Sequence, residues 1–185
     1  MEIKVRVGDI CQVDNDAILV NLFEGVEQPS GATSAVDKAL QGAISSLIGR
    51  GEIKGKFGEV SIVHTLGKLP AGIVAIAGLG KPQDFNVDKI RGATGESCRA
   101  LRKLNCHRIA TILHGTGIGG IEIEASAEAI AEGALLGLYS FTKYKKPEYE
   151  DIEEILVVIK EGHKVPILEV AIGKGKLVAE ATNLA

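Results

Sequence analysis

A glycine run between two apolar segments is the first feature of this sequence that could bind a ligand. Gly115, Gly117 and Gly120 satisfy the spacing G-x-G-x-x-G between a predicted strand and a predicted helix. Exposed backbone N–H groups in such a loop can bind an anion in any fold. The acidic residue of a dinucleotide site is missing, because the region about 20 residues further on lies inside the predicted helix. A nicotinamide or flavin site is therefore disfavoured, and two interpretations stay open: a phosphate-binding loop and a structural turn.

Other residues with catalytic potential do not form a known arrangement. The sequence contains four histidines, His64, His107, His114 and His163, without the spacing of paired metal ligands. His64 and His114 fall on or at the end of buried strands, where we expect hydrogen-bonded core histidines. Lys81 lacks the spacing of a nucleotide-binding P-loop and precedes Pro82, which predicts a solvated lysine on a turn. A G-x-S-x-G nucleophile motif is absent.

Two charged runs are interpreted as solvated surface. The acidic run comprises Glu148, Glu150, Asp151, Glu153 and Glu154 and precedes a strand, so we do not predict a metal site there. The basic, aromatic-flanked run 143–146 follows a predicted helix, whose C-terminus favours cations. Acidic residues follow this run at once and the net charge is −3, so binding to nucleic acid is not favoured.

Composition predicts one soluble globular domain. The chain has 185 residues, of which 45% are hydrophobic and 24% are charged. Cys11, Cys98 and Cys106 include no C-x-x-C pair, which favours free thiols in a reducing compartment. The N-terminus reads as a strand and not as a signal peptide, and no apolar run is long enough to span a bilayer. We therefore expect a cytoplasmic protein with no membrane partner.

Apolar runs and periodicities predict an α/β domain built around the strand at 73–77, which ends in a Gly-Lys-Pro turn. The other predicted strands lie at 3–7, 17–22, 59–66, 108–114 and 152–160. Helices are predicted from Thr33 or Ser34 to 48, from Asn86 to about 101, at 125–142 and at 176–185. The first helix would be capped by Ser34 with Asp37, and the second by Asn86. Gly92 and Gly95 would be compensated by close packing on the sheet.

The order of these elements predicts the fold class. The first two strands are expected to pair, and strands then alternate with helices. The result would be a three-layer α/β/α domain with a mixed, mainly parallel, six-stranded sheet. Because the chain ends within an Ala-rich helical run without a closing Gly or Pro, we expect the natural protein to continue beyond Ala185.

Five stretches together resemble the N-terminal domain of the leucine aminopeptidases, which are cytosolic two-metal enzymes. They are 21–25 (NLFEG), 55–59 (GKFGE), 77–81 (AGLGK), 132–145 (EGALLGLYSFTKYK) and 181–185 (ATNLA). The resemblance implies a non-catalytic domain over 1–175 and, at 176–185, the start of the helix that leads to a catalytic domain. In that family the metal ligands and the catalytic Arg lie in the C-terminal domain, so no catalytic or metal-binding residue is carried over to this chain.

The same resemblance implies properties of a longer parent protein. The parent would release N-terminal residues from peptides, preferring Leu, with two divalent metals (Zn or Mn) bound in its C-terminal peptidase domain. This chain would act as a scaffold or assembly module, with that peptidase domain and the other subunits of a homo-hexamer as partners. Some relatives also act as DNA-binding regulators, which is a second alternative function.

A more distant resemblance, in the order of short stretches around Gly8, Asp16, Ser34 and Thr116, is to the macro domains, which bind ADP-ribose. It implies a macro-like fold and an alternative function in binding ADP-ribose or another nucleotide. Asp9 would then face the adenine, and the diphosphate would lie against Gly115, Thr116, Gly117, Gly119 and Gly120. The chain departs from the family pattern at Glu24, which replaces an Asn, and at Gly31, which replaces a triple-glycine loop. Because a carboxylate near a diphosphate would repel it, we expect a shared fold with lost ligand binding.

Overall fold

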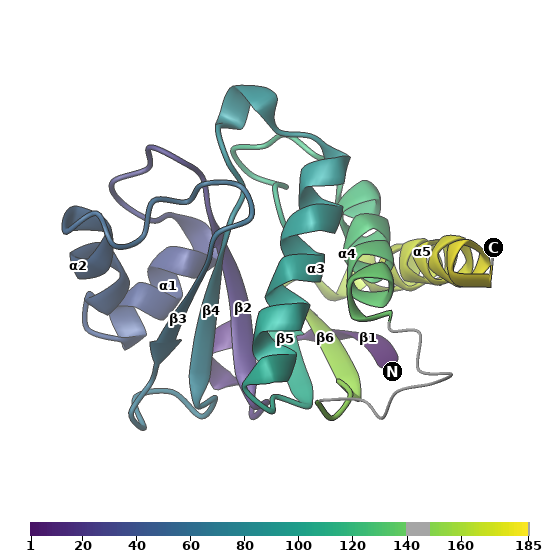
Figure 1. Cartoon of the computed structure of the whole chain (residues 1–185), viewed down its shortest axis with the longest axis horizontal. Helices are drawn as coiled ribbons and strands as arrows, with labels where there is room; N and C mark the ends of the chain where they lie inside the picture. The colour runs from purple at the N-terminus through teal and green to yellow at the C-terminus, as the bar shows by residue number, and fades with distance from the viewer. Residues whose placement is uncertain (140–148, 185) are drawn as a thin grey trace.

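The computed structural model describes residues 1–139 and 149–184, and six strands in these residues form one sheet (Figure 1). The strands are β1 (Glu2–Val7), β2 (Ala17–Leu22), β3 (Val60–His64), β4 (Ile73–Gly78), β5 (Arg108–Thr111) and β6 (Glu154–Ile159). Their order across the sheet is β1-β6-β5-β2-β4-β3. Every neighbouring pair is parallel except β3–β4, which is antiparallel. The predicted mixed, mainly parallel sheet is confirmed.

Helices cover both faces of the sheet and complete three layers. The α-helices are α1 (Gly31–Ala39), α2 (Ala43–Gly49), α3 (Val87–Lys103), α4 (Ile123–Leu138) and α5 (Val165–Leu184). Short 3₁₀ turns are formed by Ile10–Gln12, Pro82–Asp84 and Gly162–Lys164. One face carries α1 and α2, and the other carries α3, α4 and α5. The predicted α/β/α class is therefore confirmed.

The two layers of core explain why the central strands are apolar throughout. Along β2, Leu19 belongs to the cluster under α3, α4 and α5, whereas Ile18 and Val20 belong to the cluster under α1 and α2. Successive side chains of a strand point to opposite faces, so a strand that is covered on both sides needs an apolar residue at each position. This physical demand produces the uninterrupted runs at 17–20 and 73–77.

The expected pairing of the first two strands is wrong. β1 pairs with β6, in the register Glu2↔Glu154 to Val7↔Ile159, and lies at one edge of the sheet. β2 lies between β5 and β4. A 3₁₀ turn at Ile10–Gln12, capped by the Asp9 side chain, sends the chain away from β1 before β2 begins. Instead of forming a hairpin with each other, β1 and β2 each pair with strands that are distant in sequence.

The predicted first helix is two helices, and its predicted cap is wrong. Gln41 and Gly42 adopt positive φ angles of 58° and 81°, which end α1 before α2 starts. The buried Asp37 does not cap its own helix but the next one. Its Oδ1 accepts hydrogen bonds from the backbone N–H of Ile44 (2.8 Å) and of Ser45 (3.1 Å), and its Oδ2 accepts one from the Ser45 hydroxyl (2.5 Å). Asp37 thereby satisfies the free N–H groups at the start of α2.

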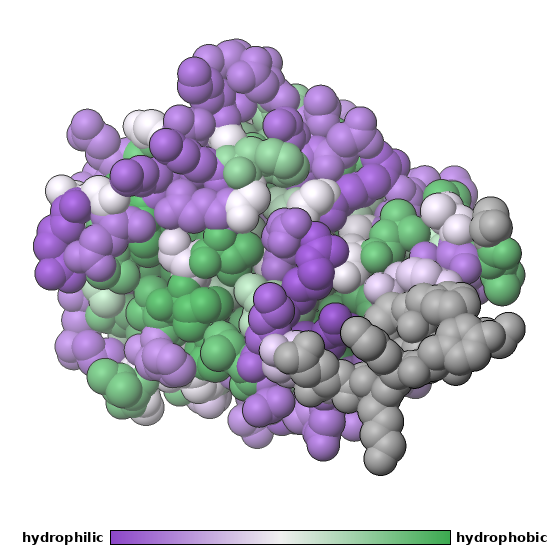
Figure 2. Space-filling model, in the orientation of Figure 1, coloured by the Kyte–Doolittle hydropathy of each residue, from purple (hydrophilic) through white to green (hydrophobic). Residues whose placement is uncertain are grey.

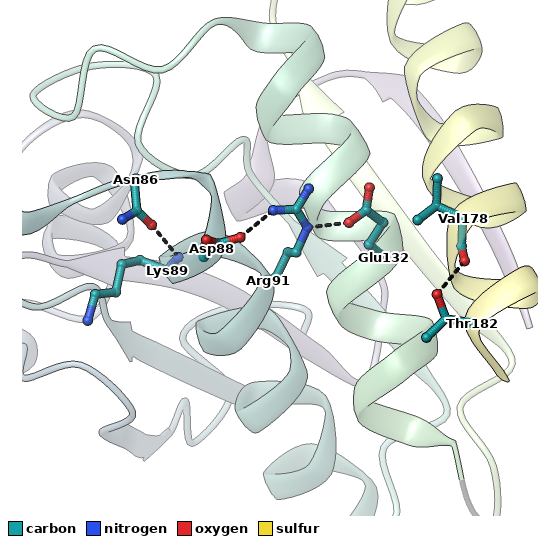
Figure 3. Close-up of polar contacts among 7 residues, drawn as sticks. All are labelled: Asn86, Asp88, Lys89, Arg91, Glu132, Val178 and Thr182. Atoms are coloured by element: carbon teal, nitrogen blue, oxygen red, sulfur yellow. Dashed lines mark hydrogen bonds and ion pairs between the residues drawn. The ribbon is translucent and has the colours of Figure 1, made fainter. Parts of the chain in front are cut away.

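α3 begins as predicted, because the Asn86 side chain accepts a hydrogen bond from the N–H of Lys89 (Figure 3). Its glycines, however, do not pack on the sheet. A Cβ at Gly92 would meet the Phe57 ring, and one at Gly95 would lie 3.0 Å from the carbonyl oxygen of Gly133 in α4. Close approach of two helices, rather than of a helix and the sheet, explains Gly95.

α5 begins at Val165, whereas the sequence predicted a helix only from 176. Pro166 occupies the first turn, where its missing N–H has no partner to lose. The predicted boundary between residues 175 and 176 falls inside this one helix, and the division into domains stays a prediction. The end of the preceding helix, predicted at 142, lies outside the described residues, as does the basic run 143–146.

Candidate ligand cavity at the carboxyl ends of the strands

A cavity of about 540 Å³ opens at the carboxyl ends of the parallel strands. Its walls come from the ends of β2 and β6, the segment after β5, the N-terminus of α1, the loop 115–118 and the segment 160–164. In open α/β sheets this edge is the usual place for a ligand, because the loops that follow the strands converge there. The fold therefore predicts a candidate ligand site at this position.

The structure brings together four of the six candidate ligand-binding residues. Asp9, Gly115, Thr116 and Gly117 line the cavity. Gly119 and Gly120, which were also candidates, are not among the lining residues. Glu24 does not line the cavity, although its neighbour Phe23 does, and the expected loss of ligand binding stays a prediction. Gly31, the remnant of the glycine-rich loop, does line it.

Most of the glycine loop is explained by packing. A Cβ at Gly115 would overlap the Phe85 ring, and one at Gly119 would lie 2.6 Å from it. Phe85 in turn packs edge-on against Phe23, with 4.9 Å between the ring centroids. Gly120 has a φ of +64°, a conformation that favours glycine. The G-x-G-x-x-G pattern thus has a structural cause at two of its three glycines, Gly115 and Gly120, and the neighbouring Gly119 is explained by packing as well.

Gly117 differs from these neighbours. A Cβ at Gly117 would meet no atom within 4 Å, and its φ is not in the left-handed region. The packing of the protein therefore gives no reason for a glycine here, at a position that lines the cavity. A ligand that approaches the backbone at this position would give a reason for the glycine.

Asn21 enters the cavity wall at the end of β2 and is held from behind by His114. Asn21 Nδ2 lies 2.9 Å from His114 Nδ1, and His114 Nε2 lies 3.3 Å from Thr111 Oγ1. The Thr111 hydroxyl donates to a backbone carbonyl, so it accepts from Nε2–H and leaves Nδ1 as the acceptor for the Asn21 amide. No described residue donates to Asn21 Oδ1, which is left as an acceptor at the cavity wall.

His114 is the hydrogen-bonded core histidine that the sequence predicts. It is completely buried, and this burial lowers the pKa of its imidazole to about 4, so the ring is neutral at physiological pH. Its carbonyl also accepts a hydrogen bond from the buried Ser126 hydroxyl of α4. His64 does not have this role: it is exposed at the end of the edge strand β3, and the prediction of a core position is wrong.

Charges at the cavity mouth are mixed. Lys160 and Lys164 line it together with Asp9 and Glu161. The Glu161 carboxylate lies 2.5 Å from Lys164 Nζ, and the hydrogen bond and charge of this lysine lower the pKa of Glu161. Neither lysine was predicted from the sequence to be a site residue. They follow the carboxyl end of the last parallel strand, and the rule that such ends converge is the signal that could have found them.

The remaining candidates are solvated or inert in the part of the chain that the structure describes. Lys81 is exposed, as predicted for a lysine on a turn. The three cysteines are free and buried, and burial raises the pKa of Cys98 to about 12 and that of Cys106 to about 11. Within 1–139 and 149–184 no group of three or more His, Cys, Asp and Glu residues could hold a metal ion. None of the helices described has the length and apolarity that crossing a membrane requires.

Comparison of the sequence with known proteins identifies the family. Residues 19–148 match the sequence profile of the family described as "Cytosol aminopeptidase family, N-terminal domain". The chain belongs to this family. The probable cytosol aminopeptidase of Sulfurihydrogenibium sp. is 34% identical over 186 residues, and that of Alkaliphilus metalliredigens is 32% identical over 189 residues. The alignments cover 99% and 100% of this chain but only 36% and 38% of these two relatives, so the chain spans little more than a third of their length.

Solved structures show the same fold at low sequence identity. A tomato leucine aminopeptidase (mutant K354E) superposes with a TM-score of 0.75 over 97% of this chain and 36% of that one, at 18% identity. A Trypanosoma brucei macrodomain in complex with ADP superposes with a TM-score of 0.69, at 15% identity, over 92% of this chain and 69% of that one. The macro-like fold is therefore confirmed.

Stretches that carry the family resemblance meet one another in the structure. The N–H of Gly80 donates to the carbonyl of Gly55 (2.9 Å), and the N–H of Glu24 donates to the carbonyl of Gly80 (2.9 Å). A Cβ at Gly55 would lie 2.6 Å from the carbonyl oxygen of Phe23. The segments 21–25, 55–59 and 77–81 thus form one closely packed corner beyond β4, in which Gly55, Gly78 and Gly80 have packing roles.

Proposed function

We propose that this chain is the non-catalytic N-terminal domain of a metal-dependent leucyl aminopeptidase, in which it serves as a scaffold. The observation that carries the proposal is the family match over 19–148 with curated relatives about 2.7 times as long. The peptidase domain would lie in the part of the natural protein that these relatives have in addition. The parent would release N-terminal residues, preferring Leu, and would act as a cytoplasmic homo-hexamer.

Two divalent metals, Zn or Mn, are part of this proposal, and the described residues do not fit them. They offer no group of three or more His, Cys, Asp and Glu that could hold even one ion. We therefore assign both metals to the peptidase domain, and no step of the reaction to this chain. Packing roles of the resembling residues, such as Gly55, Gly80 and Glu132, support a scaffold.

Expression of the full-length protein from its native reading frame tests the proposal. We expect it to release leucine from a Leu-peptide, to lose this activity in EDTA and to recover it with Mn²⁺ or Zn²⁺. A second protein that lacks residues 1–185 should have altered assembly by analytical ultracentrifugation. A full-length protein that is purified, folded and metal-loaded, yet releases no amino acid from any N-terminus, would refute the aminopeptidase assignment.

A second candidate function is the binding of ADP-ribose or a related nucleotide in the cavity. Gly117, whose lack of a side chain the protein's own packing does not require, favours it, together with the free acceptor Asn21 Oδ1. Residues 116–118 are exposed and line the cavity, where the backbone N–H groups of a loop can bind a diphosphate, and Lys160 at the mouth suits its charge.

Thermal and chemical unfolding with ADP-ribose tests this candidate. Ligand at 100 times its Kd should add about 2.7 kcal/mol to the free energy of unfolding. Gly117→Val should leave the stability of the free protein unchanged but abolish this increase, because the side chain would meet only the cavity. Ile62→Val, on the distant edge strand β3, serves as the control. An unchanged midpoint at millimolar ligand would dispose of the candidate.

A further inference from the structure

The two edge strands of the sheet differ in charge. Among the described residues, β1 forms one edge of the sheet and β3 forms the other. β1 contains three charged residues, Glu2, Lys4 and Arg6, and all three are exposed. β3 has the sequence VSIVH, without Asp, Glu, Lys or Arg. An edge strand can pair with another chain unless charges, prolines or bulges oppose it, so β1 is protected against such pairing and β3 is not.

The hydrogen bonds between β3 and β4 show which backbone groups of β3 face outward. The N–H of Gly78 donates to the carbonyl of Glu59 (2.8 Å), and the N–H of Thr65 donates to the carbonyl of Gly72 (3.0 Å). Because the residues of an antiparallel strand turn alternately toward and away from one partner, the odd-numbered residues of β3 bond to β4. The N–H and C=O groups that point to the free edge are therefore those of Val60, Ile62 and His64.

Apolar surface adjoins this edge on the side of the sheet that carries α3. Val60 and Ile62 of β3 and Ile73 of β4 pack against the core on this side, yet all three are only half-buried. Beyond the two ends of β3, Phe57 is 44% exposed and Leu66 is 88% exposed. Figure 2 shows hydrophobic surface on the left, where Figure 1 places β3 and β4. Apolar surface beside an unpaired strand is typical of an interaction site.

A second copy of β3 fits this edge without a clash of charges. We take the antiparallel pairing in which Ile62 lies opposite Ile62 of the second copy, so that the outward backbone groups of both strands meet. The other opposed residues are then Val60 with His64 and Ser61 with Val63. The same arrangement of β1, centred on Lys4 or on Val5, would place Lys4 opposite a second Lys4 or opposite Arg6, which is unfavourable.

We propose that β3 pairs with β3 of a second copy of this chain and joins the two six-stranded sheets into one. The position of the last helix favours this occupant. α5 contacts β1, at the opposite edge of the sheet, so any polypeptide that follows α5 would start far from β3 (Figure 1). The inference goes beyond the proposed function, because it names a surface for assembly and requires no peptidase domain.

Analytical ultracentrifugation of the 185-residue chain tests the pairing. We expect a monomer–dimer equilibrium. Ile62→Lys should raise its dissociation constant at least about tenfold, because two like charges would lie directly opposite each other. The aliphatic stem of the lysine can follow the apolar surface while the amine reaches water. Val5→Lys is the matched control: it alters a half-buried valine of the other edge strand and should leave the dissociation constant unchanged.

Residue-resolved hydrogen exchange of the unmodified chain tests the same contact without a substitution. Between a dilute and a concentrated sample, the N–H groups of Val60, Ile62 and His64 should slow at least about tenfold, because the second copy supplies their acceptors. The N–H of Val5 in β1 should exchange at the same rate in both samples. If Ile62→Lys does not fold, this measurement decides alone.

Three results would overturn the proposal. The first is a chain that stays monomeric at its highest soluble concentration. The second is a dimer that Val5→Lys weakens and Ile62→Lys does not. The third is a dimer in which the slowed amides lie outside 60–64, because the second copy would then bind to another surface. Peptidase activity enters none of these results, so the failure of this inference and the failure of the proposed function are distinguishable.

Discussion

At the scale of single residues, the buried pair of Asn21 and His114 joins the core to the cavity wall. His114 has no contact with solvent, yet its neutral ring fixes which end of the Asn21 amide faces the cavity. Burial of an imidazole without a charged partner favours its neutral form, so the protonation state of this residue is coupled to folding.

This coupling predicts acid sensitivity. The pKa of His114 is about 4 in the folded protein, below the ordinary value of about 6.5 that we expect in the unfolded chain. Between these values the unfolded chain binds the extra proton, so stability falls as the pH drops from about 6.5 to about 4, by up to about 3 kcal/mol. Urea unfolding at several pH values measures this loss. His114→Gln, although less stable at pH 7, should lack this part of the slope, and an identical slope in both proteins would contradict the assignment.

Residue types alone did not predict which glycines are required by close packing and which have space for a side chain. Gly115 and Gly119 follow from the position of Phe85, which comes from another segment about 30 residues earlier in the chain. Likewise, the spacing around Asp37 predicted a local cap, whereas the carboxylate reaches the N-terminus of the following helix. Both cases depend on contacts that a local pattern does not contain.

At the scale of elements, the connection between α1 and α2 depends on the Asp37 carboxylate. Asp37→Ala would leave two N–H groups and one hydroxyl without an acceptor, at a cost of about 2 kcal/mol. Asp37→Asn keeps one amide oxygen as an acceptor and should lose less. Guanidinium unfolding of both variants gives the two values. Equal losses, or none, would mean that the carboxylate does not cap α2.

Contact between α3 and α4 depends on small residues and on one ion pair. Arg91 of α3 pairs with Asp88 and with the buried Glu132 of α4 (Figure 3). Gly95 and Gly137 meet beside it, where a Cβ at Gly137 would lie 2.5 Å from the Gly95 Cα. The packed glycines let the helix backbones approach closely enough for this contact.

Replacing a glycine at this contact by alanine should therefore destabilise the protein, although alanine is the better helix former. Gly133→Ala would force a methyl group against the Arg91 carbonyl, and we expect it to destabilise the protein by about 1–3 kcal/mol. Gly173→Ala on α5 has no atom within 4 Å of the new methyl group and should stabilise by up to about 1 kcal/mol. Thermal unfolding compares the two. Stabilisation by both substitutions would show that α3 and α4 are not in close contact.

Elements whose hydrophobic residues follow one clear pattern could be predicted from the sequence. An element with hydrophobic residues over most of its surface could not. β2 and β4 are apolar runs of strand length, and α3 has one apolar face and an Asn cap. α5 carries buried and exposed hydrophobic residues over most of its circumference, so its first half showed no single helical stripe, and Pro166 obscured its start. The pairing of β1 with β6 joins residues about 150 positions apart, which no local pattern encodes.

At the scale of the whole molecule, the cavity and the last helix, α5, lie on different parts of the domain. The cavity opens beyond the carboxyl ends of the strands, whereas α5 is the outermost helix of one layer. Part of the cavity was predicted from the sequence, because a parallel sheet brings the ends of its strands together, but Lys160 and Asn21, which lie at such strand ends, were not predicted as wall residues.

The most direct test of the account is a peptidase assay of the purified 185-residue chain. The chain should release no leucine from a Leu-peptide above the rate of metal in buffer, with Mn²⁺ or with Zn²⁺, because the described residues hold no set of ligands for either ion. Release that requires metal, stops with EDTA and persists after the chain is unfolded, purified and refolded would contradict the claim that its reactive half lies elsewhere.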